Sequence, residues 1–373
     1  MSIYSNLTIL TDEEIDELYG IPKIDPDDKP LLFEITPEDE AYLDQQANVL
    51  NKINYILQLA YFRASRQFYK FKFEDVRDDV WFIINSYFPK THFPKEPTSK
   101  SKHYEAQKVI LSIYNYKRYN AEFSVELGRQ AKRLSKRDLS SRFIFDELLN
   151  FCEQHKIVRS KYSTLQSFVS KAIQREEKRL SKKLGELLDK ESRETLDLLL
   201  ADDKTISDLT LLKQDPKSFA TNEMRKELKK HQNIVGLFQK SKKMMADLGI
   251  SRQNIQYYSN ICDFYDIYQL RRFPFIKSRL CMICLVWQRF TKLNDHLTTY
   301  LVHKIKRYEE LAEADAGKKV LEAKLGVSED RKLASKMLKV VNNPDVNHND
   351  IRPKCYEIIN KDDFEEFTNN LAE

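Results

Sequence analysis

At 373 residues the chain is longer than a usual single domain, and its 41% of hydrophobic residues can form real cores, which excludes wholesale disorder. Only seven glycines and eleven prolines are available for turns, so a protein of many short strands is disfavoured and an all-α fold is expected. The net charge of +5 is unevenly distributed, because residues 1–50 hold 13 acidic against 2 basic side chains and the rest holds 44 against 60. The excess of basic side chains after residue 50 indicates a polyanionic partner, and DNA or RNA is the leading candidate.

A compact helical DNA-binding unit is expected over residues 1–92. Apolar side chains recur at helical spacing in 52–69 and again in 74–88. Thr11 and Glu14 have the spacing of a capping box and predict the start of a helix, and Gly20 predicts its end. Thr36 followed by Pro37 predicts the start of another helix.

Residues 93–102 carry prolines among small and basic side chains and are expected to form a linker. A basic helical DNA-binding unit is expected to follow over 103–190, and residues 100–137 alone hold ten basic against three acidic side chains. These cations could neutralise phosphates and fix the register on DNA; the alternative is a solvated face whose tyrosines point into the core. The candidate residues are Lys100, Lys102, Lys117, Arg118, Arg129, Lys132, Arg133, Lys136 and Arg137.

The end of this unit has a helix-turn-helix-like pattern. A helix is expected to end near His155, a short basic turn follows, and Ser163 with Gln166 predicts a capping box for the next helix. Its outward face would carry Gln166, Ser170, Lys171, Gln174, Arg175 and Lys178, and its inward face Leu165, Phe168, Val169, Ala172 and Ile173. Arginine suits guanine edges and glutamine suits adenine edges, so all of the outward residues except Ser170 are candidate DNA contacts. The alternative is an ordinary two-helix corner with a solvated basic face.

Residues 200–312 are expected to form a helical connector, and 313–373 a partial C-terminal region. Cys281 and Cys284 have the spacing of a zinc half-site, but no second pair lies nearby, so they are interpreted as small apolar residues and no metal site is expected. Leu280, Ile283, Trp287, Phe290, Asn294, Leu297 and Leu301 follow a heptad rhythm. This rhythm suits either a helix buried within one domain or a homodimer interface.

Signatures of catalysis are missing from the sequence. It has no P-loop, H-E-x-x-H or G-x-S-x-G motif, so no catalytic residue, cofactor or small-molecule substrate is expected in this chain. The longest strongly apolar run, residues 280–287, is too short to cross a bilayer, and no membrane partner is expected. Five sparse cysteines indicate thiols in a reducing cytosol.

Several segments, in one order, resemble the replicative transposases of the Tn-three family over roughly residues 5–310. They are residues 5–20, 59–62, 68–71, 76–80, 155–173, 248–258, 268–272 and 286–290. The resemblance implies a bacterial, nucleoid-associated protein that binds double-stranded DNA at the terminal inverted repeats of a transposon. The family's Asp-Asp-Glu site and its magnesium belong to a later domain, so this chain is expected to bind without cutting. The alternative is a helical protein-interaction and dimerisation module, paired through residues 275–308, without specific DNA binding.

Overall fold

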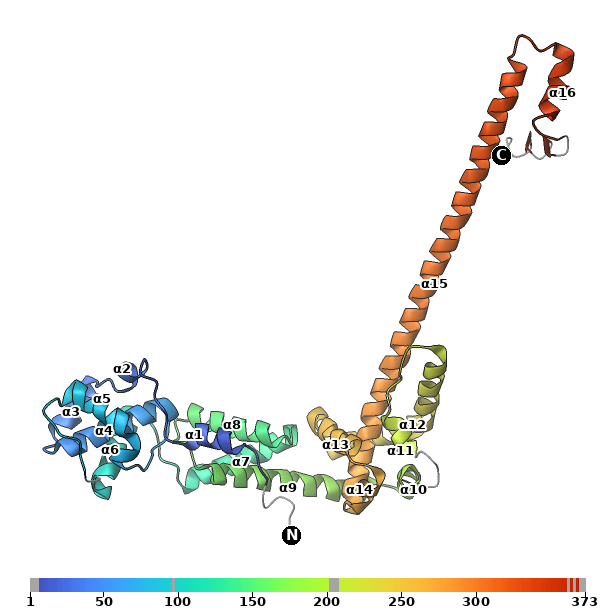
Figure 1. Ribbon diagram of the computed structural model, residues 1–373. Coiled ribbons are helices and arrows are strands. Elements are labelled where there is room, and N and C mark those ends of the chain that lie inside the picture. The colour runs from blue at the N-terminus through green and yellow to red at the C-terminus, as the bar shows by residue number, and fades with distance from the viewer. Residues whose placement is uncertain (1–6, 96–97, 201–207, 361–362, 365–366, 369–373) are drawn as a thin grey trace. The chain divides into compact units, whose positions relative to one another are not determined.

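The computed structural model describes residues 7–95, 98–200, 208–360, 363–364 and 367–368 (Figure 1). Within these residues the regular elements are helices, with one isolated parallel bridge between Lys117 and Ile157, so the predicted all-α class is confirmed. The chain divides into two compact units. Unit 1 comprises Met1–Asp215 with Lys229–Lys292, and unit 2 comprises Pro216–Leu228 with Leu293–Glu373.

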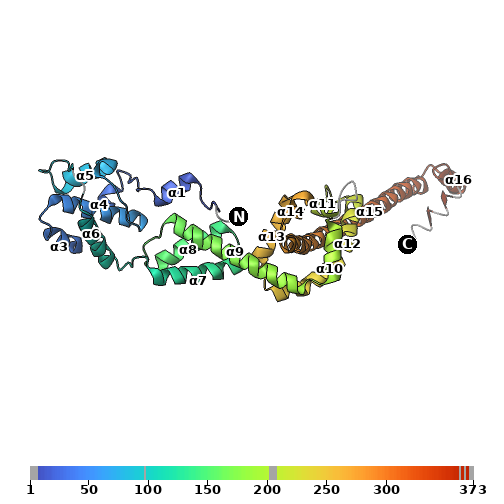
Figure 2. The same cartoon turned by 90° about the horizontal axis from the view of Figure 1, so that it is seen from below.

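The first hydrophobic core of unit 1 is built around α4 (Val49–Ser65), in which every residue from Ile53 to Phe62 is buried. A helix buried on all sides lies at the centre of its domain. The surrounding elements are α2 (Lys29–Leu32), α3 (Pro37–Asp44), η1 (Phe73–Val76), α5 (Arg77–Tyr87) and α6 (Lys100–Ile113). Because α6 packs against α4 and adds Ala106 and Ile110, residues on both sides of 93–102 share this core (Figure 2).

The predicted helix ends of the N-terminal segment are confirmed. Helix α1 (Asp12–Tyr19) has Thr11 at its N-cap in a capping box with Glu14, and it ends at Gly20. A Cβ atom at residue 20 would clash with the backbone oxygen of Asp16, which explains the glycine. Helix α3 starts after Thr36, in a second capping box, with Pro37 in its first turn.

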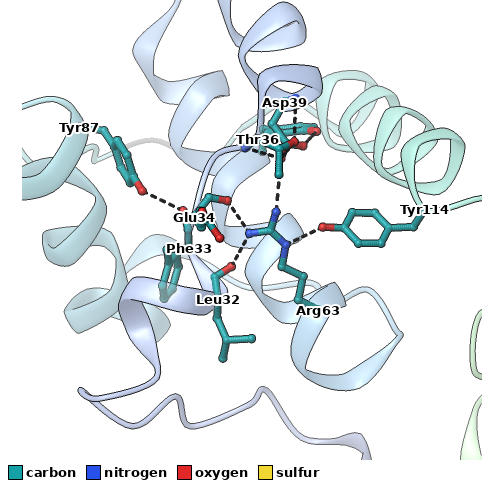
Figure 3. A network of polar contacts seen from close by, with 9 residues as sticks. Leu32, Phe33, Glu34, Thr36, Asp39, Arg63, Tyr87 and Tyr114 are labelled. Atoms are coloured by element: carbon teal, nitrogen blue, oxygen red, sulfur yellow. Dashed lines mark hydrogen bonds and ion pairs between the residues drawn. The ribbon is translucent and has the colours of Figure 1, made fainter.

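A buried polar network ties the loop before α3 to α4 (Figure 3). Arg63 donates to the carbonyls of Leu32, at 3.0 Å, and Glu34, and its Nε donates to the Tyr114 hydroxyl at 2.6 Å. Its Nη2 lies 3.4 Å from Asp39 Oδ2, and that carboxylate, fully buried, also accepts from the Tyr55 hydroxyl at 2.6 Å. The desolvated charges are therefore paired and hydrogen-bonded, as buried charges must be.

A three-helix bundle follows in the same unit, made of α7 (Ala121–Arg137), α8 (Ser141–Gln154) and α9 (Tyr162–Leu187). Each of the three packs against the other two (Figure 2). Helix α7 buries Leu127 and Ala131, and α9 buries Leu165, Val169 and Ile173. Apolar side chains at this helical spacing leave the opposite faces of both helices to water.

The remaining helices of unit 1 form a core from the aromatic and cysteine-rich segments of the sequence. They are α10 (Lys190–Leu199), α11 (Asp208–Lys213), α13 (Arg252–Phe264), α14 (Ile267–Arg272), and parts of α12 (Thr221–Leu248) and α15 (Phe275–Val341). Trp287 and Phe290 of α15 pack against Phe238 of α12, with ring centroids 4.9 and 3.8 Å apart. Trp287 and Phe290, two members of the predicted heptad pattern, therefore pack against another helix of the same chain.

Unit 2 contains the rest of α12 and α15, with η2 (His348–Asp350) and α16 (Ile351–Tyr356). Within it His296 Nδ1 lies 2.9 Å from the buried carboxylate of Glu227. Farther along α15, Leu301 is 58% exposed. Among the described helices of the chain, none is both long and apolar enough to span a membrane.

Candidate nucleic-acid interface

Five basic residues form one exposed face of α7, named here the α7 basic face: Arg129, Lys132, Arg133, Lys136 and Arg137. They recur every three or four residues, opposite to the side on which Leu127 and Ala131 are buried. Within the described residues only Arg129 of this set has a carboxylate partner, Glu126 one turn earlier. The other four cations have no carboxylate partner among the described residues, and the Arg137 guanidinium lies 5.2 Å from the centre of the Phe143 ring.

The carboxyl end of α7 is fixed by the start of α13. Ser251 Oγ donates to the carbonyl of Arg137 at 2.6 Å. Asn254, fully buried, donates through Nδ2 to the carbonyls of Ser135 and Lys136 at 3.0 and 3.2 Å. These bonds satisfy the last helical carbonyls, which lack partners within α7, so the basic side chains project from a rigid helix end.

The turn between α8 and α9 differs from the prediction at one point. Helix α9 begins at Tyr162, and its N-cap Lys161 makes no side-chain cap bond, so the predicted Ser163–Gln166 capping box is wrong. The Tyr162 hydroxyl instead accepts from the backbone N–H of Ile9 at 3.1 Å, and Gln166 Nε2 donates to the carbonyl of Leu7 at 2.9 Å. Contacts with the N-terminal segment therefore set the start of α9.

Three of the predicted base-reading residues stand on the exposed side of α9, named here the α9 basic stripe: Lys171, Arg175 and Lys178. Gln174 is half-buried, and Gln166 already donates to the N-terminal segment. Ser170, expected on the outward face, is buried instead, because the packed side of α9 is wider than the apolar pattern alone indicates.

The other predicted residues lie at the join between the first core and the bundle. Lys100 is exposed in the first turn of α6, and Lys102 pairs with Glu105 at 2.9 Å. Lys117 exchanges backbone hydrogen bonds with residues 156 and 158, which hold the α8–α9 turn. Arg118 donates to Gln107 Oε1 at 2.9 Å, and its guanidinium lies 4.1 Å from the centre of the Tyr104 ring.

At this join lies a cleft of about 1040 Å³. Its basic lining residues are Lys70, Lys100, His103, Arg118, Arg159 and Lys161. Its aromatic lining residues are Tyr19, Phe68, Tyr69, Phe71, Tyr104, Tyr119 and Tyr162. No Asp or Glu stands among the described residues that line it. A cleft lined by one sign of charge focuses its potential and attracts the opposite charge.

Sequence reasoning missed Lys70, Arg159 and Lys161 as members of this cleft. Arg159 is oriented by donating through Nη1 to the carbonyl of Leu18 at 2.9 Å. The signal for two of them was present, since residues 159 and 161 lie in the basic turn before α9. Lys70 has no such signal, because only the fold brings the segment after α4 beside that turn.

Three polar side chains at the cleft, those of Tyr19, Thr98 and His103, lack a hydrogen-bond partner in the described part of the chain or have a shifted pKa. Tyr19 Oη and Thr98 Oγ1 are buried atoms with no hydrogen-bond partner among the described residues. Burial raises the pKa of the Tyr19 hydroxyl above its ordinary value. Burial also lowers the pKa of His103, whose ring nitrogens lie 3.0 Å from Asn54 Oδ1 and 3.2 Å from the Tyr69 carbonyl.

The first core, the α7 basic face, the cleft and the start of α9 lie in a stretch that is similar to one family model. Residues 9–172 match a domain of unknown function, DUF4158. The match ends within α9, between Lys171 and Arg175 of the α9 basic stripe. A comparison with curated proteins found no match to the chain.

The described residues contain no group of three or more His, Cys, Asp or Glu that could hold a metal ion. Cys262, Cys281 and Cys284 are buried as free thiols. Burial raises the pKa of Cys262 to about 12, and it raises those of Cys281 and Cys284 as well. Thiols in this environment act as small apolar residues.

Proposed function

We propose that this chain is the DNA-binding, non-catalytic portion of a transposase and binds the terminal inverted repeats of a transposon. Its partner would be double-stranded DNA, in the cytoplasm of a bacterium and at the nucleoid. The observation that carries the proposal is the α7 basic face, where four exposed cations have no carboxylate partner among the described residues.

Electrostatics support DNA as the partner. Phosphate contacts by lysine and arginine supply most non-specific affinity, and they need cations that internal acids do not already neutralise. Of the twelve lysines and arginines among the predicted DNA contacts, only Lys102 and Arg129 form an ion pair with a carboxylate in the described part of the chain. The α7 basic face can therefore hold the phosphate backbone and set the register without reading sequence.

Sequence reading is assigned to α9. A helix that follows another after a short turn can lie in the major groove and present its exposed side chains to base edges. Arg175 is exposed on α9 and can form the bidentate pair that recognises guanine. Gln166 is half-buried and engaged with Leu7, so its contact to adenine would require that bond to open.

The family match supports the same function. DUF4158 domains occur in the N-terminal regions of Tn-three-family transposases. The segments that resemble those transposases include residues 155–173 and 248–258, which contain the start of α9 and the residues that anchor α7. In the proposed function these segments build and brace the DNA-binding surface.

Selection from a random duplex library by the full chain tests the proposal. We expect one motif to be enriched, and to match repeats flanking the gene, with binding about a thousandfold or more tighter than to shuffled duplex. Arg175→Ala should relax the enriched motif at one position, whereas Lys332→Ala on α15 is a matched control that should leave it intact. Equal affinity for every duplex would overturn sequence-specific binding.

A further inference from the structure

We infer that the cleft between the first core and the α8–α9 turn binds unpaired nucleotides of a single DNA strand. This inference rests on the proposed function and adds a second DNA-binding site to it. In this arrangement the α7 basic face and α9 hold the duplex, and the cleft takes a strand where base pairing is interrupted.

The charge of the cleft indicates a polyanion. Five of its lining residues are lysines or arginines: Lys70, Lys100, Arg118, Arg159 and Lys161. Among the described residues none of these five cations pairs with a carboxylate, and the lining contains no acid. Several cations along one cleft fit a chain of phosphates better than a single charged group.

The aromatic residues select an unstacked base over a duplex. Tyr104 is 56% exposed at the rim, with the Arg118 guanidinium over its ring at 4.1 Å. Gln107 accepts a hydrogen bond from Arg118 at 2.9 Å, which holds the Arg118 guanidinium over the Tyr104 ring without a ligand. Bases in a duplex already stack on each other, whereas unpaired bases can stack on tyrosine and arginine planes.

Size and hydrogen bonding agree with this assignment. The volume of about 1040 Å³ reaches the top of the range of roughly 300–1,000 Å³ that holds small ligands, so it fits more than one nucleotide. Tyr119 and Ser163 line the cleft with neutral hydroxyls, which can donate to or accept from base edges.

The test uses fluorescence anisotropy of the full chain with three labelled probes: a homothymidine strand, a continuous duplex, and the same duplex with an internal thymidine bulge. We expect the bulged duplex to bind more tightly than the continuous one. Tyr104→Ala should weaken binding of the single strand and the bulge about tenfold, while continuous duplex binding stays unchanged. Tyr104→Phe keeps the ring and should retain affinity, and Tyr308→Ala is the matched control, because Tyr308 is 66% exposed on α15.

Equal affinity of the bulged and continuous duplexes would overturn the inference and leave duplex binding, and with it the proposed function, intact. Displacement of the single strand by polyglutamate at equal charge concentration would also overturn it, because the cleft would then be a general anion site. Loss of continuous duplex binding alone, in the variant Arg133→Ala with Lys136→Ala, would support separate sites. If the wild type holds the single strand and the bulge but no continuous duplex, the cleft stands and the proposed function fails.

Discussion

Removal of two cations from the α7 basic face, by Arg133→Ala with Lys136→Ala, tests whether this face contacts phosphates. Both side chains are exposed and have no carboxylate partner among the described residues. Each phosphate contact adds about 0.9 to the slope of log K against log salt, so the double variant should lower the slope by about 1.8. Alanine is the best helix former, so α7 itself should persist.

The structure also ranks the single variants. Arg129 is already paired with Glu126, so Arg129→Ala should lower the slope by less than the roughly 0.9 expected for one full contact. Lys332→Ala with Lys336→Ala removes the same two charges from an exposed part of α15 and serves as the control. It should change the slope little, because its charges lie outside the proposed interface.

The assay is anisotropy of a labelled duplex at a series of salt concentrations, with circular dichroism to confirm that each variant keeps its helix content. A slope lower by about 1.8 means that a roughly fourfold rise in salt costs the variant about tenfold less affinity than the wild type. An unchanged slope would refute phosphate contact by this face. An equal fall in the α15 control would show that only net charge matters.

Four other outcomes are expected. Arg63→Met should speed hydrogen exchange in α4 by about a thousandfold, because breaking a buried pair costs roughly 3–5 kcal/mol; exchange at the wild-type rate would contradict the role of the network. Arg175→Ala should cost about 1–3 kcal/mol on the selected site. Gln166→Ala should change base preference less, because Gln166 is held by the Leu7 carbonyl; unchanged base preference in both variants, measured by competition binding, would remove α9 as the reader. Burial lowers the pKa of His103 from its ordinary 6.5, so the unfolded chain binds more protons and stability should fall as the pH drops through and below that value. Urea unfolding of His103→Gln should show a smaller loss on acidification, and an equal loss would refute this. With magnesium the chain is expected not to nick a supercoiled plasmid that carries the selected motif, and nicking at the motif would refute the binding-only function.

The helical class and several helix ends were predictable because they depend on local chemistry. Thr11 and Thr36 each bond to residues three positions later, so their capping boxes can be read from the sequence. The N-cap of α9 was predicted at Ser163, two residues after the observed Lys161, because a distant contact decides where the helix starts. Tyr162 binds the backbone of Ile9, more than a hundred residues earlier, and no local pattern encodes that.

The candidate site divides in the same way. The α7 basic face was predictable, since its five cations repeat at helical spacing within one helix. The cleft was not, because its lining extends from Tyr19 to Ser163 and depends on contacts between the core and the bundle. One contact is the bridge of Lys117 with Ile157, and another is the pair of bonds from Gln67 and Arg159 to the Leu18 carbonyl.

The acidic N-terminal segment does not cancel the basic faces, and the contacts show why. Glu14 accepts the N-cap bond of Thr11 and pairs with Arg142, and Asp39 is buried with Arg63. Among the described residues, none of the fourteen predicted DNA contacts has an ion pair with an acid of residues 1–50. In the described residues, the hydrogen bonds between the segment and α9 use neutral groups, at Tyr162 and Gln166. Two of its thirteen acids are thus held in folding contacts, and no ion pair of the described residues joins the segment to the cations of α7 and α9, which remain available to the proposed DNA.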